Sequence, residues 1–174
     1  MAIKTIFLDR DGVINEEKQY LYKIDDFQFI DGVFDACRHF ISQGFQIIII
    51  TNQSGIARGL YKEKDFESLT NWMIKEFKEN KVKILDVFHC PHSVNENCGC
   101  RKPKAGMFFK ADRIYNIDLN NSWMIGDKEE DIQAAINAGI ENTILVRSGH
   151  RIDEINTKAL FIIDSIKQSI KIIS

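Results

Sequence analysis

The chain has 174 residues, of which 44% are hydrophobic, so it can form one domain with a buried core. Its 23 basic and 25 acidic residues leave a formal net charge of −2, which does not supply the broad positive surface of a nucleic-acid-binding protein. No cationic segment followed by a long apolar stretch begins the chain, and its longest apolar run, Ile47–Ile50, is too short to span a bilayer. We therefore expect a cytoplasmic protein without nucleic-acid or membrane partners, and we expect it to be a monomer.

Strand-like apolar runs alternate with amphipathic helical segments along the chain. The predicted strands cover residues 3–8, 45–50, 85–89, 123–125, 143–146 and 160–163. The predicted helices cover residues 31–44, 63–79, 105–115, 129–137 and 165–172, whereas 15–29 and 90–103 show no regular period. Alternation of strand and helix is typical of a parallel sheet that helices cover on both faces. We predict a single Rossmann-like α/β domain over residues 1–174.

Two acidic residues follow the first predicted strand directly. Along an extended chain, Asp9 and Asp11 share a face about 6.5 to 7 Å apart, while Arg10 points away. Gly12 then allows the backbone to turn sharply. Paired carboxylates at a strand end can hold a divalent cation, or one can attack phosphorus while the other handles a proton. Taken alone, the motif is equally compatible with an Asp-rich turn that has no catalytic function.

Polar residues also follow two other predicted strands. Thr51, Asn52 and Ser54 come after the second strand, and Asp127 comes after the fourth. The carboxyl ends of parallel strands meet at one edge of a sheet, which is where ligands bind in such folds. We therefore expect these side chains to lie near Asp9.

The basic pair Arg101-Lys102 follows the irregular loop. A guanidinium can hold a phosphate through two hydrogen bonds, and an ammonium can neutralise a phosphoryl group during its transfer. By itself the pair could be a solvated basic turn. Together with the acids and the hydroxyl at the sheet edge, it predicts a phosphate site.

Three of the four cysteines lie in the irregular loop together with a histidine. Cys90, His92, Cys98 and Cys100 supply three thiolates and an imidazole, the closed tetrahedral set that structural zinc prefers. In a chain without a secretion signal, such a cluster favours metal binding over disulfides. We predict a structural zinc ion that holds residues 90–100 and, through the last ligand, places the basic pair. No role is predicted for the remaining cysteine and histidines: Cys37, His39, His89 and His150.

Four motifs of the chain together resemble those of the haloacid dehalogenase superfamily of aspartate-nucleophile phosphatases. They are Asp9-Arg10-Asp11-Gly12, Thr51-Asn52-Gln53-Ser54-Gly55, Arg101-Lys102-Pro103 and Gly126-Asp127-Lys128. More narrowly, the chain resembles the capless branch that contains the D-glycero-D-manno-heptose 1,7-bisphosphate 7-phosphatases and the histidinol-phosphate phosphatases. The resemblance implies magnesium-dependent hydrolysis of the sugar 7-phosphate through an aspartyl-phosphate, in the synthesis of nucleotide-activated heptose for lipopolysaccharide.

The resemblance also implies roles for individual residues. Asp9 would be the nucleophile and Asp11 the general acid/base. Thr51 and Lys102 would stabilise the phosphoryl group, and Asp127 would bind Mg²⁺ together with Asp9 and the Asp11 carbonyl. The implied substrate contacts are Arg10, Glu17, Tyr20, Asn52, Gln53, Ser54, Arg101 and Lys128.

Two segments depart from the pattern of that branch. Lys18 and Gln19 stand in a flap turn where relatives commonly have a His-Gly-Tyr-like sequence, and Lys104-Ala105-Gly106 lacks a proline often found there. These departures bear on which substrate is bound and not on the reaction that is catalysed.

Three alternative functions follow from parts of the pattern. A histidinol-phosphate phosphatase would share the motifs and the zinc loop, although a short polar loop with Arg101 suits a bisphosphate better. A non-enzymatic zinc-binding module would not need Asp9, Asp11, Lys102 and Asp127 together. A nucleic-acid 3′-end phosphatase is disfavoured by the acidic balance of the chain.

Overall fold

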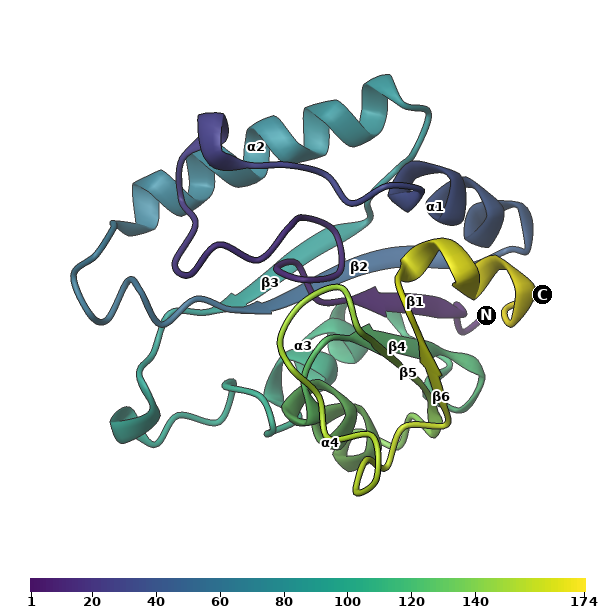
Figure 1. Cartoon of the computed structure of the whole chain (residues 1–174). Coiled ribbons are helices and arrows are strands. Elements are labelled where there is room, and N and C mark those ends of the chain that lie inside the picture. The colour runs from purple at the N-terminus through teal and green to yellow at the C-terminus, as the bar shows by residue number, and fades with distance from the viewer.

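Six parallel strands form one sheet in the computed structural model, which describes residues 1–174 (Figure 1). Their order is β3-β2-β1-β4-β5-β6, and every neighbouring pair is parallel. The strands are β1 Thr5–Leu8, β2 Gln46–Asn52, β3 Asp86–Cys90, β4 Trp123–Gly126, β5 Asn142–Val146 and β6 Phe161–Ile163. Because β1 lies between β2 and β4, its carboxyl end is at the middle of the sheet edge.

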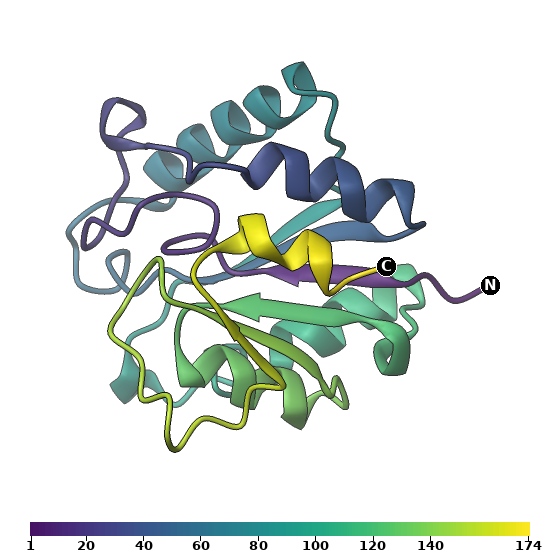
Figure 2. The same ribbon diagram turned by 45° about the vertical axis from the view of Figure 1, so that its right-hand side comes forward.

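Helices cover both faces of this sheet, as predicted (Figures 1 and 2). Helices α1 (Val33–Ser42) and α2 (Glu63–Glu79) lie on one side with the C-terminal 3₁₀ helix η4 (Ile166–Lys171), and α3 (Gly106–Tyr115) and α4 (Glu129–Asn137) lie on the other. The alternation along β1 explains the two layers, since Ile6 and Leu8 join one hydrophobic cluster and Phe7 joins the other. The predicted α/β architecture is confirmed. Three shorter 3₁₀ turns are η1 Ile24–Asp26, η2 Val94–Glu96 and η3 Leu119–Asn121.

Some element boundaries differ from prediction for identifiable reasons. Strand β2 continues through Thr51 and Asn52, which pair with His89 and Cys90 of β3 rather than lying in a loop. Helix α1 begins two residues later than predicted, because Gly32 before it has a φ of 83° and forms a turn. The C-terminal segment is 3₁₀ rather than α, and the Ser169 hydroxyl donates to its own turn at the Ile166 carbonyl (2.5 Å).

The segment between β1 and α1 covers the carboxyl edge of the sheet on the side of α2 (Figure 1). Phe27 and Phe29 anchor it, since both rings contact Trp72 of α2 with centroids 5.3 and 5.8 Å apart. The loop between β5 and β6 covers the edge from the opposite side, where Arg147 pairs with Glu154 and Asp164. Two loops of one domain therefore flank the sheet edge.

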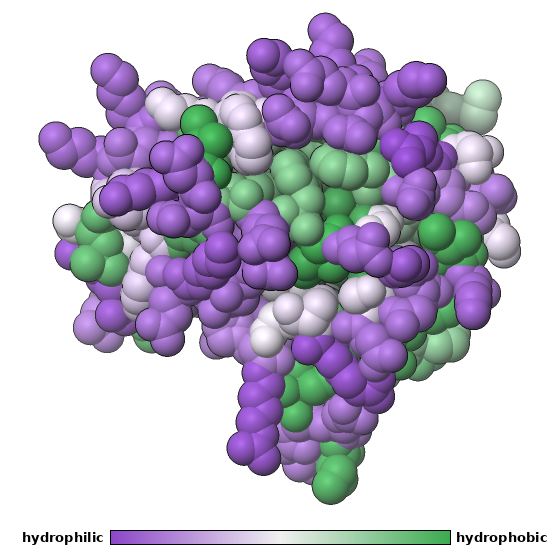
Figure 3. Space-filling view, turned by 45° about the horizontal axis from the view of Figure 1, so that its top comes forward, coloured by the Kyte–Doolittle hydropathy of each residue, from purple (hydrophilic) through white to green (hydrophobic).

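Polar residues dominate the outer surface on the α1 and α2 side, and apolar residues gather in a band near the middle of that view (Figure 3). Helix α2 illustrates the pattern, because it buries Phe66, Leu69, Met73 and Phe77 and turns its charged residues outward. No helix combines the length and the apolar composition that crossing a membrane requires.

Candidate active site

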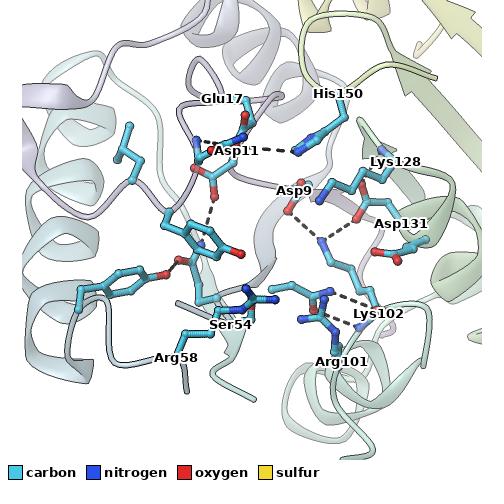
Figure 4. Close-up of a pocket in the computed structure, with 17 residues that line it drawn as sticks. Asp9, Asp11, Glu17, Ser54, Arg58, Arg101, Lys102, Lys128, Asp131 and His150 are labelled. Carbon is cyan, nitrogen blue, oxygen red and sulfur yellow. Dashed lines mark hydrogen bonds and ion pairs between the residues drawn. The ribbon is translucent and has the colours of Figure 1, made fainter. Parts of the chain in front are cut away.

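A cavity of about 430 Å³ lies at the carboxyl edge of the sheet (Figure 4). Ten of the predicted site residues line it: Asp9, Asp11, Glu17, Tyr20, Asn52, Gln53, Ser54, Arg101, Lys102 and Lys128. Seven further residues, to which the sequence assigned no function, complete the lining: Gln19, Leu21, Arg58, Tyr61, Glu130, Asp131 and His150. Strand ends and loops that are distant in sequence thus meet at the carboxyl edge of the sheet, as expected for parallel strands.

Lys102 enters the floor of this cavity as a fully paired ammonium. Its Nζ donates to Asp9 Oδ1 (2.8 Å) and to the Ile50 carbonyl (3.0 Å), and it forms an ion pair with Asp131 Oδ1 (2.7 Å). Burial alone would lower the pKa of Lys102, but Asp131 and Asp9 raise it above its ordinary value. The lysine therefore remains charged and points directly at the predicted nucleophile.

Three buried carboxylates lie together at this point, and the Lys102 ammonium pairs with two of them, Asp9 and Asp131. Asp9, Asp127 and Asp131 bring oxygens within 4.8 Å of one another, so negative charge exceeds positive charge by two in this cluster. Burial and the Asp131 charge raise the pKa of Asp127 to about 6 and the pKa of Asp9 well above its ordinary value. A divalent cation bound to this cluster would balance its excess negative charge.

Asp127 presents one free oxygen to that cluster. Its Oδ2 accepts the backbone N–H of His150 (2.9 Å) and contacts His150 Nδ1 (2.6 Å), whereas its buried Oδ1 has no partner. The backbone approaches closely around it, since a Cβ on Gly12 or Gly149 would lie 2.4 or 2.1 Å from Oδ2. A hard, anionic oxygen set with one unpaired buried acceptor fits Mg²⁺.

Asp11 lies in the cavity wall, held by three donors. Its Oδ1 accepts from Arg10 Nη2 (3.0 Å) and Asn15 Nδ2 (3.1 Å), and its Oδ2 accepts from Gln53 Nε2 (3.2 Å). Burial raises the pKa of Asp11, but the Arg10 guanidinium and these hydrogen bonds outweigh it, so the pKa lies below its ordinary value. In this arrangement Asp11 is an anion with a fixed orientation.

The structure gives Arg10 and Thr51 different surroundings from those predicted. Arg10 neither points away from the acids nor lines the cavity: it is 1% exposed and donates to the Leu21 carbonyl (2.9 Å) and to Asp11. Because its guanidinium holds Asp11, the expectation that Arg10 points away from the acids is wrong. Thr51 is also buried and does not line the cavity, and its hydroxyl accepts from Gln53 Nε2 (2.8 Å).

Asn52 holds the backbone of Lys102 through its side-chain amide. Asn52 Nδ2 donates to the Lys102 carbonyl and Asn52 Oδ1 accepts the Lys102 N–H, both at 3.1 Å. Since Asn52 is the last residue of β2, this pair of bonds fixes Lys102 to the sheet itself.

The four predicted zinc ligands converge in the loop that follows β3. Cys90 Sγ lies 3.6 Å from Cys98 Sγ and 3.1 Å from Cys100 Sγ, and His92 Nδ1 lies 3.3 and 3.5 Å from the thiols of Cys100 and Cys90. All four cysteines of the chain are free thiols. Ligands at usual Zn–S distances in a tetrahedron are about 3.8 Å apart, so this cluster is compatible with zinc.

Arg101 joins the zinc cluster to the cavity. Its backbone N–H donates to Cys98 Sγ and its Nη1 donates to the His92 carbonyl, both at 3.4 Å. The side chain nevertheless lines the cavity near Lys102 and Ser54 (Figure 4). The loop therefore supports this guanidinium directly.

Asp131 and His150 are the main functional candidates that sequence reasoning missed. Asp131 had a local signal, because it is an acid in the first turn of α4, three residues after the N-cap Lys128. Its Oδ2 accepts the N–H groups of Asp127 and Lys128, both at 3.1 Å. His150 had no such signal, since only the course of the β5–β6 loop brings it onto Asp127.

Comparison with known proteins gives consistent matches over most of the chain. The family model described as HAD-hydrolase-like matches residues 99–169. The D-glycero-alpha-D-manno-heptose-1,7-bisphosphate 7-phosphatase of Campylobacter jejuni is 53% identical over 146 residues, which cover 84% of each chain. The D-glycero-beta-D-manno-heptose-1,7-bisphosphate 7-phosphatase of Vibrio cholerae is 46% identical over 175 residues, covering 96% of this chain and 94% of the relative.

A solved structure shares the whole architecture. The D,D-heptose 1,7-bisphosphate phosphatase from B. bronchiseptica, complexed with magnesium and phosphate, superposes with a TM-score of 0.84 at 29% identity. The similarity covers 97% of both chains.

Proposed function

Since the chain belongs to the D-glycero-D-manno-heptose-1,7-bisphosphate 7-phosphatase family of HAD-like hydrolases, we propose that it hydrolyses the 7-phosphate of that sugar bisphosphate. The supporting observation in the site is the buried contact of Lys102 Nζ with Asp9 Oδ1 beside two further carboxylates. A zinc-binding interaction module has no use for this arrangement. We place the reaction in the synthesis of nucleotide-activated heptose for lipopolysaccharide.

The proposed reaction has two displacements at phosphorus. An oxygen of Asp9 attacks the 7-phosphate, the bond from phosphorus to the sugar oxygen breaks, and Asp11 protonates that oxygen. Water then attacks the aspartyl-phosphate while Asp11 takes its proton, which releases phosphate and regenerates Asp9. Lys102 neutralises charge on the phosphoryl oxygens throughout.

Magnesium would be held by Asp9, Asp127 and the Asp11 carbonyl, and it would supply positive charge that stabilises the transferring phosphoryl group. Asp11 must carry a proton in the first displacement, although Arg10 favours its anion in the resting site. A bound phosphate dianion beside Asp11 opposes Arg10, because a like charge raises the pKa of a carboxyl group.

We also propose that the enzyme acts as a cytoplasmic monomer on a small molecule, without nucleic-acid or membrane partners. The free thiols of the cysteine cluster favour a reducing compartment. The net charge of −2 disfavours a polyanionic polymer as substrate. Light scattering coupled to size-exclusion chromatography tests the oligomeric state.

A phosphate-release assay tests the proposed activity. The substrates are both anomers of the heptose 1,7-bisphosphate, because the relatives are named for either anomer, and histidinol phosphate for comparison. We expect turnover of the heptose bisphosphate with Mg²⁺ and none by Asp9→Asn, whose amide has the same shape but is a poor nucleophile. Preferred hydrolysis of histidinol phosphate, or activity in the folded Asp9→Asn variant, would refute the proposal.

A further inference from the structure

We propose that Tyr61 is a positioning residue for Asp11 and acts through the side-chain amide of Gln53. The inference rests on the proposed function, since Asp11 needs positioning only if it transfers protons. Tyr61 belongs to none of the motifs that the sequence analysis singled out.

A chain of three hydrogen-bonded side chains connects Tyr61 to the acid/base. The Tyr61 hydroxyl donates to Gln53 Oε1, and Gln53 Nε2 donates to Asp11 Oδ2 at 3.2 Å. The same Nε2 donates to the Thr51 hydroxyl at 2.8 Å. Tyr61 and Gln53 are 5% and 3% exposed, so water does not readily replace these contacts.

The direction of these bonds follows from the chemistry of the groups. A carboxylate only accepts hydrogen bonds, so the amide must turn Nε2 toward Asp11. Oε1 of Gln53 then faces Tyr61, whose hydroxyl must donate. Burial raises the pKa of Tyr61 to about 12, so the hydroxyl keeps its proton over the working range of the enzyme. Without this donor, Oε1 would be buried without a hydrogen-bond partner, which is unfavourable. The orientation of the amide that points Nε2 at Asp11 would then be less stable.

The tyrosine ring is held by contacts that do not involve its hydroxyl. It lies against Gly55, where a Cβ would come within 2.2 Å of the ring, and it stacks on Tyr22 with centroids 5.3 Å apart and an interplanar angle of 12°. Replacing Tyr61 by phenylalanine therefore removes one hydrogen-bond donor and leaves the packing in place.

The expected effect is moderate, because Arg10 and Asn15 also hold Asp11. Loss of one ordinary hydrogen bond predicts a decrease of about two- to tenfold in kcat/KM. The decrease should depend on the leaving group, since only a basic alkoxide needs the proton that Asp11 delivers.

The experiment compares Tyr61→Phe with the wild type on two substrates, heptose 1,7-bisphosphate and p-nitrophenyl phosphate, whose phenolate leaves without protonation. We expect kcat/KM to fall for the sugar and to stay within about twofold for the aryl ester, a split that general loosening of the site would not produce. Tyr22→Phe is the matched control and should leave both values unchanged.

A double-substitution cycle tests whether the effect passes through Gln53. In a Gln53→Met background, Tyr61→Phe should cause no further loss. Equal losses on both substrates, no loss, or full additivity with Gln53→Met would each overturn the inference. Failure of the wild type to hydrolyse the sugar bisphosphate would instead refute the proposed function, and the two failures are therefore distinguishable.

Discussion

Loss of the zinc site should weaken substrate binding far more than it slows the chemical step. We consider Cys98→Ser, which removes one thiolate from the cluster and the sulfur that accepts the Arg101 backbone N–H. Arg101 depends on the loop for both of its contacts. Lys102 does not, because Asn52 holds its backbone from β2 and Asp9 and its other acceptors fix its Nζ. From the sequence we expected zinc to place both Arg101 and Lys102. These contacts lead us to expect that it places Arg101 only.

The size of the effect follows from what Arg101 would lose. A hydrogen bond to a charged group contributes about 1.5 to 3 kcal/mol, which corresponds to about 10- to 150-fold in kcat/KM. We expect this loss in KM, with kcat within about threefold of wild type, since the interaction is made equally in the bound and the transition state. The fold should persist, because nearly all residues of the two hydrophobic clusters on the sheet lie outside the zinc loop.

The assay combines metal analysis with kinetics. Wild type should contain about one zinc ion per chain that Mg²⁺ does not replace, because thiolates are soft ligands and Mg²⁺ prefers hard oxygens. Val94→Ser, at an exposed position of the same loop, is the control that should retain both zinc and KM. A kcat more than tenfold lower with unchanged KM, or wild-type kinetics in a zinc-free variant, would contradict this reasoning.

Three other predictions concern the anion and cation sites. Arg101→Ala should raise KM for the bisphosphate more than for a monophosphate, because the guanidinium would bind the phosphate that is not cleaved; equal effects on both substrates would assign it to the reacting phosphoryl group. His150→Ala removes the ring contact to Asp127 Oδ2, and Mg²⁺ affinity measured by calorimetry on metal-depleted protein should fall about tenfold. Unchanged affinity would show that the backbone N–H suffices. Since the pKa of Asp127 is raised to about 6, the folded state holds a proton that the unfolded chain loses at lower pH. Stability of the metal-depleted protein should therefore decrease as pH rises through about 6, and Mg²⁺ or Asp127→Asn should reduce this slope in thermal unfolding.

The fold and the place of the site were predictable because the relevant signals are local. Runs such as Ile47–Ile50 indicate buried strands, and parallel neighbours need a connection, most often a helix, that returns the chain to the edge where the strands begin. Asp9, Thr51 and Asp127 each follow or end a strand, so the parallel order brings them together. The spacing of the three cysteines and His92 was likewise sufficient to predict the ligand cluster that the structure assembles.

Contacts that depend on side-chain direction and burial were not predictable. Asp131 could have been an ordinary capping acid at the start of α4, and it is one, but its other oxygen also pairs with Lys102. Arg10 was expected to point away because strand alternation was applied beyond Leu8, where β1 has already ended. The hydrogen bond from Tyr61 to Gln53 has no sequence signal, since neither side chain is unusual at its position.

The neighbouring residues Arg101 and Lys102 are held by different parts of the structure, and this difference affects how the site would bind and cleave a substrate. Lys102 is fixed to β2 and to the buried carboxylates, which form a rigid part of the sheet edge. Arg101, its direct neighbour, is fixed to the zinc loop and faces the outer cavity. Lys102, which we propose neutralises the reacting phosphoryl group, is thus attached to the core of the domain. Arg101, which would recognise the rest of the substrate, is attached to a loop. Substitutions of the two loop residues that hold Arg101 through the cluster, His92 and Cys98, should therefore change which phosphate ester binds while leaving the rate of the bound substrate nearly constant.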